Sequence, residues 1–247
     1  MTLRSAVGPL VLAVALAGCA TAVPYDPFQI PEPQFREKVR RIALAPIVVP
    51  PQLGVSEPAK LAFDALIEAK LREAGFATFP AKEWGEVFAR VQKEAGGVFD
   101  PNTGRPDDAK IKAIWAKTAA EVRSRFQLDA VLLPRVQIVK ADWRSASASW
   151  DGVSDMLASG MGLLGAPNAF GTMPALSLVV SIGAGDSETT AYYRHRGGIQ
   201  VLEKLTPISE RFSGKIFAPV PPEQLLADAE RNRGAIDVAL GPLLKKP

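Results

Sequence analysis

The apolar run that follows residue 40 does most to determine which fold this 247-residue chain can adopt. The run, "RIALAPIVVP" at residues 41–50, is short and rich in isoleucine and valine, which is typical of a buried strand. A helical pattern follows it, because Ser56 can cap a helix, Pro58 can open it and Gly75 can end it. A strand followed directly by a helix indicates an α/β fold.

The residues that follow continue this alternation of helix and strand. The first helix is expected to bury its apolar and alanine positions, which are Leu61, Ala62, Ala65, Leu66 and Ala69. The run "FATFP" predicts a second short strand, and residues 84–95 and 107–126 have the spacing of two amphipathic helices. The run "LDAVLLPRVQIV" is the clearest strand in the chain, and Pro134 within it predicts a bulge or a sheet edge beyond it.

The second half of the chain is rich in strand patterns. "WRSASASW" predicts a polar ribbon, and "LSLVVSIG" places Leu178, Val180 and Ile182 on one face of a strand. Residues 151–173 are rich in small residues and poorly periodic, so we expect a flexible segment there. Pro221 and Pro222 then open a last helix. The predicted fold class is therefore α/β (α+β), a single domain over residues 39–247 with a mixed sheet flanked by helices, a β-rich second half and a C-terminal helix.

The N-terminus has the pattern of an export signal. Arg4 supplies a positive charge, residues 10–17 supply a short apolar run, and small residues surround Gly18 and Cys19. The apolar run is too short to span a bilayer, which needs about 20 residues. We therefore expect residues 1–18 to be a signal peptide that is removed.

The placement of the only cysteine adds a family resemblance. Leu16-Ala17-Gly18-Cys19 resembles the lipobox of bacterial lipoproteins. The resemblance implies that Cys19 becomes the first residue, that its thiol and amino group are acylated, and that Ala20 directs sorting to the outer membrane, facing the periplasm. Several acyl chains are enough for stable anchoring. The alternative is a free, buried cysteine in an ordinary export signal.

Residues 19–38 are expected to be the lipidated N-terminus and a proline-rich tether. Pro24, Pro27, Pro31 and Pro33 favour an extended, semi-rigid spacer that holds the folded domain away from the bilayer. With Cys19 acylated, the chain keeps no thiol for a disulfide or a thiolate metal site. Its 29 basic and 26 acidic residues are spread along the chain, so the composition does not indicate nucleic-acid binding.

The candidate catalytic and cofactor motifs lack the context that their chemistry needs. "GMGLLG" at residues 160–165 matches a dinucleotide-binding fingerprint, with Asp186 downstream, but neither a strand precedes it nor a helix follows it. "DPNTG" at residues 100–104 starts like a calcium loop, but Ile111 stands where the bidentate glutamate belongs, which favours a turn between two helices. His195 lies between two arginines and is interpreted as a surface or edge-strand residue. We therefore predict no enzyme, no metal and no cofactor.

The four tryptophans are the remaining candidates for a binding surface. Trp84 and Trp115 lie on helical stripes and are expected in the core. Trp143 and Trp150 flank the polar ribbon and are better candidates than Trp84 and Trp115 for a surface that meets a protein partner or a glycan, although ordinary packing is the favoured interpretation for them too.

The order of elements over residues 40 to about 205, together with the lipobox, resembles a group of small exported α/β lipoproteins and their relatives. These are the curli-secretion channel subunit, the lipoprotein activators of penicillin-binding proteins, and the N-terminal domain of the TolB translocation protein. The resemblance implies action through partners or assemblies, and no catalytic residue.

Three hypotheses about function follow from these patterns. The leading one is an outer-membrane lipoprotein that acts as a non-catalytic binding or assembly module on an envelope partner. The second is a subunit of an oligomeric export channel in which Ser145 to Ile182 supplies membrane-crossing hairpins, and a homo-oligomer fits this reading. The third is an envelope enzyme, which the absence of a nucleophile–base or metal pattern disfavours.

Overall fold

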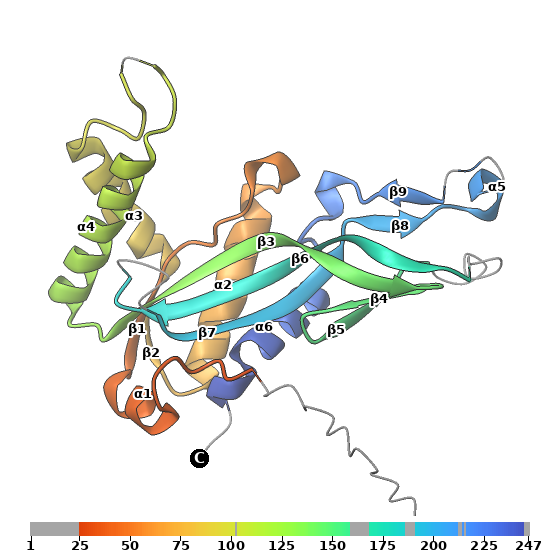
Figure 1. The fold of residues 1–247 in the computed structure, drawn as a ribbon. Helices are drawn as coiled ribbons and strands as arrows, with labels where there is room; N and C mark the ends of the chain where they lie inside the picture. The colour runs from red at the N-terminus through yellow and green to blue at the C-terminus, as the bar shows by residue number, and fades with distance from the viewer. Residues whose placement is uncertain are drawn as a thin grey trace, which may run out of the picture.

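The computed structural model describes residues 25–244 except 102, 159–167, 186–190, 212–213 and 215. Within them, a mixed seven-stranded sheet carries helices on both faces, and the chain ends in a helix (Figure 1). This arrangement confirms the predicted α/β class, the mixed sheet and the C-terminal helix.

The first half of the chain builds a parallel part of the sheet. β1 (Arg41–Leu44) lies between β2 (Ala77–Phe79) and β3 (Ala130–Arg144), and both pairings are parallel. Parallel strands need helical crossovers, and α2 (Glu57–Glu73), α3 (Ala81–Glu94) and α4 (Asp108–Phe126) supply them. The side chains of α2 pack on one face of the sheet, and those of α3 and α4 pack on the other.

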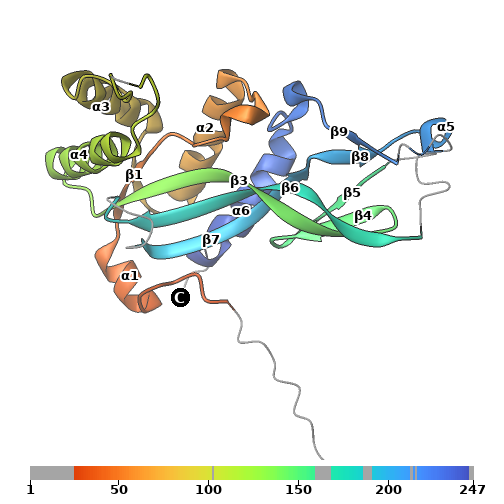
Figure 2. The same ribbon diagram turned by 45° about the horizontal axis from the view of Figure 1, so that its top comes forward.

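The second half adds long antiparallel strands. β3 pairs along its whole length with β6 (Phe170–Gly183), and β6 pairs with β7 (Ala191–Val201). At the far end lie β4 (Ser147–Trp150), β5 (Val153–Met156), β8 (Glu203–Leu205), β9 (Phe217–Pro219) and the short α5 (Ile208–Arg211). Figure 2 shows this ribbon end extending away from α3 and α4.

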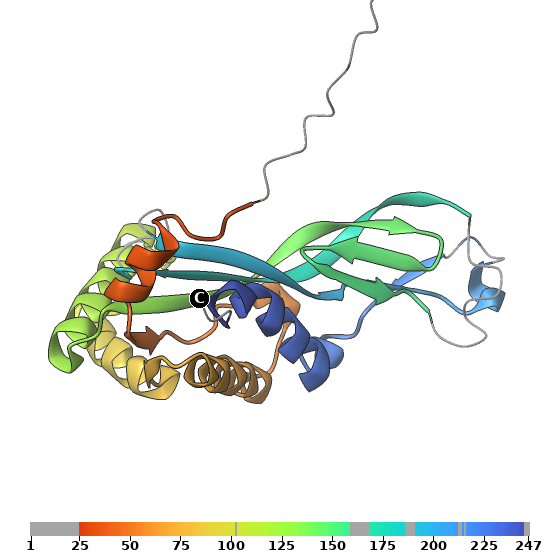
Figure 3. The same cartoon turned by 90° about the horizontal axis from the view of Figure 1, so that it is seen from below.

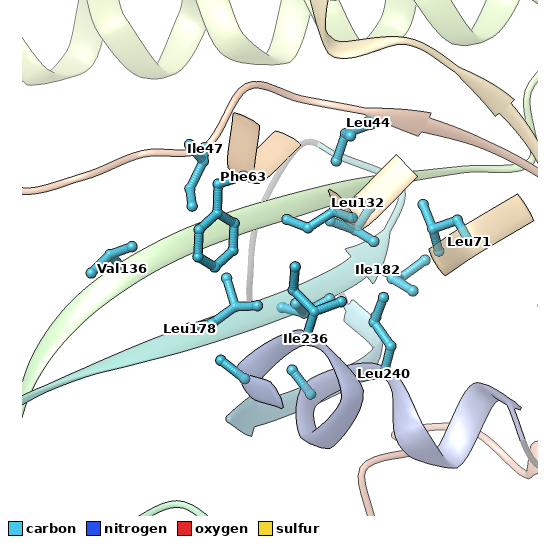
Figure 4. Packing of buried hydrophobic residues seen from close by; sticks show 14 of the residues in the cluster. Leu44, Ile47, Phe63, Leu71, Leu132, Val136, Leu178, Ile182, Ile236 and Leu240 are labelled. Atoms are coloured by element: carbon cyan, nitrogen blue, oxygen red, sulfur yellow. The ribbon is translucent and has the colours of Figure 1, made fainter. Parts of the chain in front are cut away.

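The main core lies between the sheet and two helices, α2 and α6 (Ala229–Leu244). Leu178, Val180 and Ile182 face this core from β6, as their alternation predicted. Figure 4 shows side chains from α2, α6, β1, β3 and β6 converging in one cluster, among them Leu44, Phe63, Leu71, Leu132, Leu178, Ile182, Ile236 and Leu240.

Two consecutive glycines let the sheet be covered closely from both sides. A Cβ at Gly197 would lie 2.0 Å from the Ala235 carbonyl oxygen of α6. A Cβ at Gly198 would lie 2.7 Å from the Trp150 Nε1 atom of β4. Neighbouring strand residues point to opposite faces. α6 and the β4–β5 hairpin therefore approach the same point of β7 from opposite sides.

The buried face of α2 differs from the predicted one. Phe63, Ile67 and Leu71 are fully buried, whereas Leu61 is 57% exposed. The predicted stripe followed the alanines, but burial of large side chains removes more apolar surface from water. The helix therefore turns Phe63, Ile67 and Leu71 toward the core.

Pro134 lies within β3, which continues to Arg144, and the predicted sheet edge begins there, because regular pairing of β3 with β1 ends at Leu132. The Pro134 carbonyl accepts a hydrogen bond from the Val48 N–H (3.0 Å), and the Val136 N–H donates to the Val48 carbonyl (2.8 Å). The missing N–H of Pro134 thus faces the segment after β1, where regular pairing has already stopped.

Two further boundaries differ from the predictions. The segment 151–173, expected to be flexible, contains β5 and the start of β6, and its residues 159–167 lie outside the described residues. The last helix begins at Ala229 instead of Pro222, where a short 3₁₀ turn stands. Leu226, which precedes the helix, is buried in a left-handed conformation (φ 57°), so the chain turns there before α6 begins.

The N-terminal segment is part of the domain instead of a spacer. α1 (Glu32–Lys38) begins with Pro33 in its first turn, a position that proline favours, and Phe35 is fully buried. Before it, the Arg194 N–H donates to the Pro27 carbonyl and the Gln29 N–H donates to the Tyr192 carbonyl, both at 2.8 Å. Figure 3 shows this segment beside β7. The predicted tether over residues 19–38 is therefore wrong from residue 25 onward.

Candidate functional site

A groove with a volume of about 640 Å³ lies between α4 and the sheet. It forms where the parallel strand β1 ends at Leu44 and the chain leaves the sheet through Ala45 and Pro46. The crevice outside the carboxyl ends of parallel strands is the usual ligand position in α/β sheets. The groove is lined by Ala45, Pro46, Val48, Asp108, Ile111, Lys112, Trp115, Leu133, Pro134, Arg135 and Gly185.

The walls of this groove are apolar and firmly supported. Trp115 lines it from α4, and the centroid of its ring system lies 5.8 Å from that of Trp84 and 5.1 Å from that of Phe88. On the other side, Val48 is 42% exposed although it is aliphatic. Because Trp115 is held by two aromatic neighbours, its wall is formed before any ligand arrives.

The rim of the groove carries charge. Lys112 and Arg135 are exposed cations, and Asp108 is an exposed carboxylate one helical turn before Lys112. The described lining residues include no serine, threonine, cysteine or histidine. The lining can bind an apolar group and attract a negative one, but it offers no nucleophile–base pair.

A buried carboxyl group supports one wall of the groove. Asp64 of α2 is 6% exposed and accepts a hydrogen bond from the Ile47 N–H (2.9 Å). Ile47 lies between Pro46 and Val48, which line the groove. Burial raises the pKa of Asp64 to about 7; the Ile47 N–H opposes this shift, and Glu57 and Glu68 add to it. The sequence analysis missed Asp64, although a polar residue beside Phe63 in an apolar helix face is a signal.

Trp150 does not form a partner surface. It is 7% exposed, and its Nε1 atom donates to the Leu176 carbonyl at 3.0 Å. The β4–β5 hairpin folds over Gly198 and places Trp150 inside, so Trp150 is packed, as the favoured interpretation had it, and is excluded as a partner surface.

Trp143 is half-buried and reaches a second, shallower cavity of about 600 Å³. Its ring contacts Phe217 edge-to-face at 5.2 Å, and a Cβ at position 171 would lie 3.0 Å from its Nε1 atom. Most of the rim is polar, and it consists of Asp142, Arg144, Ser145, Ser147, Ser149, Ser154, Phe170 and Gly171. Phe170 is the exposed aromatic side chain at this cavity, with 80% of its surface open to water. The sequence analysis missed it.

An ion-pair cluster fixes the ribbon end to α6. Asp155 of β5 is 8% exposed and accepts from Lys204 Nζ at 3.0 Å and from Arg231 Nη1 at 2.6 Å. Burial alone would raise the pKa of Asp155, but the hydrogen bonds from Arg231 and Lys204 outweigh it and lower the pKa. Because all three charges have partners, the cluster holds β5, β8 and α6 together.

The other candidate residues have structural positions. His195 lies on β7 at the edge beside the N-terminal segment, as predicted, and its ring stacks on Tyr25 with centroids 5.8 Å apart. Burial lowers the pKa of His195, and Asp151 opposes the shift. Residues 100–104 form a turn in which the Gly104 N–H donates to the Asp100 carbonyl (2.8 Å), which confirms the predicted turn.

Several predicted residues lie outside the described part of the chain. They are the lipobox residues Leu16, Ala17, Gly18 and Cys19, the glycine motif at 160–165, and Asp186. In the part that is described, no helix combines the length and apolar character needed to cross a membrane. Across the same residues, no cluster of three or more histidine, cysteine, aspartate or glutamate side chains is placed to hold a metal ion.

Comparison with known proteins gave no match. Neither protein-family models, nor curated proteins, nor solved structures resemble the chain significantly.

Proposed function

We propose that this protein is a lipid-anchored lipoprotein of the outer membrane whose periplasmic domain binds an envelope partner without catalysis. The anchor is Cys19, acylated in the sequence context Leu16-Ala17-Gly18-Cys19. The binding site is the groove between α4 and the end of β1. The order of elements supports the same proposal through its resemblance to exported α/β lipoproteins.

The groove is the observation that carries this proposal. Its walls are apolar, with Trp115 held in place and Val48 exposed. Binding of a partner removes these walls from water, which favours the complex. Lys112 and Arg135 at the rim can orient a partner with a negative group. A partly exposed aromatic side chain at the centre of a site with a charged rim is a common arrangement in protein recognition sites.

The structure gives less support to an export channel. Residues of the segment from Ser145 to Ile182 form β4, β5 and part of β6 within the domain's own sheet. Leu178, Val180 and Ile182 belong to the main core, so moving this segment into a membrane would open that core. The binding module is therefore the better proposal.

Site-specific photocrosslinking in intact cells tests the proposal. A photoreactive residue at Val48 or at Lys112 lies on the groove, whereas one at Leu61 is equally exposed on α2, across the sheet. We expect positions 48 and 112 to crosslink to the same envelope protein and position 61 to give no such product. Val48→Asp should remove the crosslink from position 112. Equal crosslinking from all three positions would refute the groove as the binding site.

A further inference from the structure

The chain between the lipidated cysteine and the folded domain is short. Tyr25 is six residues after Cys19, so the link spans at most about 20 Å even when fully extended. A spacer that lasted to residue 38 would have allowed about 65 Å. Because the domain begins at Tyr25, the greatest distance between it and the bilayer is about one third of the distance that the longer spacer would allow.

The exit point of this link is fixed on the domain. The Tyr25 hydroxyl donates to the Arg194 carbonyl (2.7 Å), and Phe28 pairs with Tyr193 across the edge of β7. Phe28 and Phe35 then pack against Tyr193. If residues 25–30 left the β7 edge to lengthen the link, these contacts would break and the Phe28 ring would lose its packing against Phe35 and Tyr193.

The surface around this exit point has groups that suit lipid headgroups. Tyr25 is 62% exposed, and Lys38 lies over the Tyr192 ring with its Nζ atom 4.3 Å from the centroid. Residues 25–41 contain four lysines and arginines against three aspartates and glutamates, and β7 adds Arg194 and Arg196. Tyrosine is favoured at membrane interfaces, and cations are attracted to anionic lipids.

We infer that the bilayer surface is a direct contact of this domain, made through an anchor strip that consists of residues 25–30, α1 and the outer edge of β7. The inference rests on the proposed acylation of Cys19. The short link brings this strip to the headgroups, and its fixed exit point sets one orientation of the domain. The exposed side of α2 around Leu61 then stands away from the lipid (Figure 3).

Fluorescence quenching in vesicles tests this orientation. The full acylated protein is reconstituted into vesicles of phosphatidylglycerol and phosphatidylethanolamine that contain a headgroup nitroxide lipid. Because the acylated Cys19 has no free thiol, single cysteines can be labelled at Gln29 and Glu37 on the anchor strip, and at Leu61 as an exposed control. We expect at least threefold stronger quenching at 29 and 37 than at 61. Equal quenching at the three positions would overturn the inference.

A longer link separates the role of chain length from surface attraction. Inserting 20 glycine and serine residues between Pro24 and Tyr25 should reduce quenching at positions 29 and 37 to the level of the control. Unchanged quenching would contradict the short link as the cause. A chain that carries no acyl group and does not float with vesicles would overturn the proposed function together with this inference, whereas a floating chain with equal quenching overturns the inference alone.

Discussion

Replacing Phe35 with alanine tests whether α1 belongs to the folded domain. The Phe35 ring is fully buried, with centroids 5.4 Å from Phe28, 6.1 Å from Tyr193 and 6.5 Å from Phe76. Losing a buried phenylalanine removes its transfer free energy and leaves a cavity, which together cost about 3–5 kcal/mol. If residues 19–38 were a free spacer, the same substitution would cost nothing.

Urea unfolding of the whole chain, followed by tryptophan fluorescence, measures this cost. Trp84 is fully buried and reports on the core. We expect Phe35→Ala to lower the free energy of unfolding by about 3–5 kcal/mol with an unchanged slope. Gln34→Ala, at an exposed position of α1, should change it by less than about 0.5 kcal/mol. Equal midpoints for the two variants would refute the docking of α1.

Three further substitutions test the account. Gly197→Ala places a Cβ 2.0 Å from the Ala235 oxygen, so thermal unfolding should show a loss of about 3 kcal/mol, whereas Gly85→Ala, with open space in α3, should stabilise slightly. The pKa of Asp64 is about 7 in the folded state and 3.8 for an unperturbed carboxyl. The protonated carboxyl therefore supports stability at low pH, and this support is lost as the pH rises from about 4 to about 7. Asp64→Asn should gain stability relative to the parent between pH 4 and pH 8, by about 4 kcal/mol in chemical denaturation; a difference that does not depend on pH would refute the assignment. Trp115→Ala should abolish the crosslink from Lys112 while membrane attachment, measured by fractionation, is retained.

Local patterns predicted most of the regular elements. The positions of β1, α2, β2, α3, α4 and β3 follow from apolar periodicity and from prolines and glycines at helix ends, which act within a few residues. Gly75 ends α2 with φ 88°, a conformation that glycine adopts at little cost. These signals are local, so a single sequence reveals them.

The errors concern contacts between distant parts of the chain. The prolines of the N-terminal segment are compatible with both a spacer and a helix start, and the burial of Phe35 against Tyr193 decides between them. Alternation in "WRSASASW" separates the serines from Trp150, but only the approach of the hairpin to Gly198 shows that Trp150 is on the inner side. The groove likewise joins residues from the segment after β1, from α4 and from β3, and no local pattern indicates it.

The most direct test of the account is the chemical state of Cys19 in the protein extracted from membranes. Mass spectrometry of the N-terminal peptide should show a chain that begins at Cys19 and carries acyl groups on both its sulfur and its amino nitrogen. Cys19→Ala should remove the modification and release the protein from the membrane fraction. A mature chain in which Cys19 keeps a free thiol, or one that still begins at Met1, would contradict the proposal that this domain works at the membrane surface.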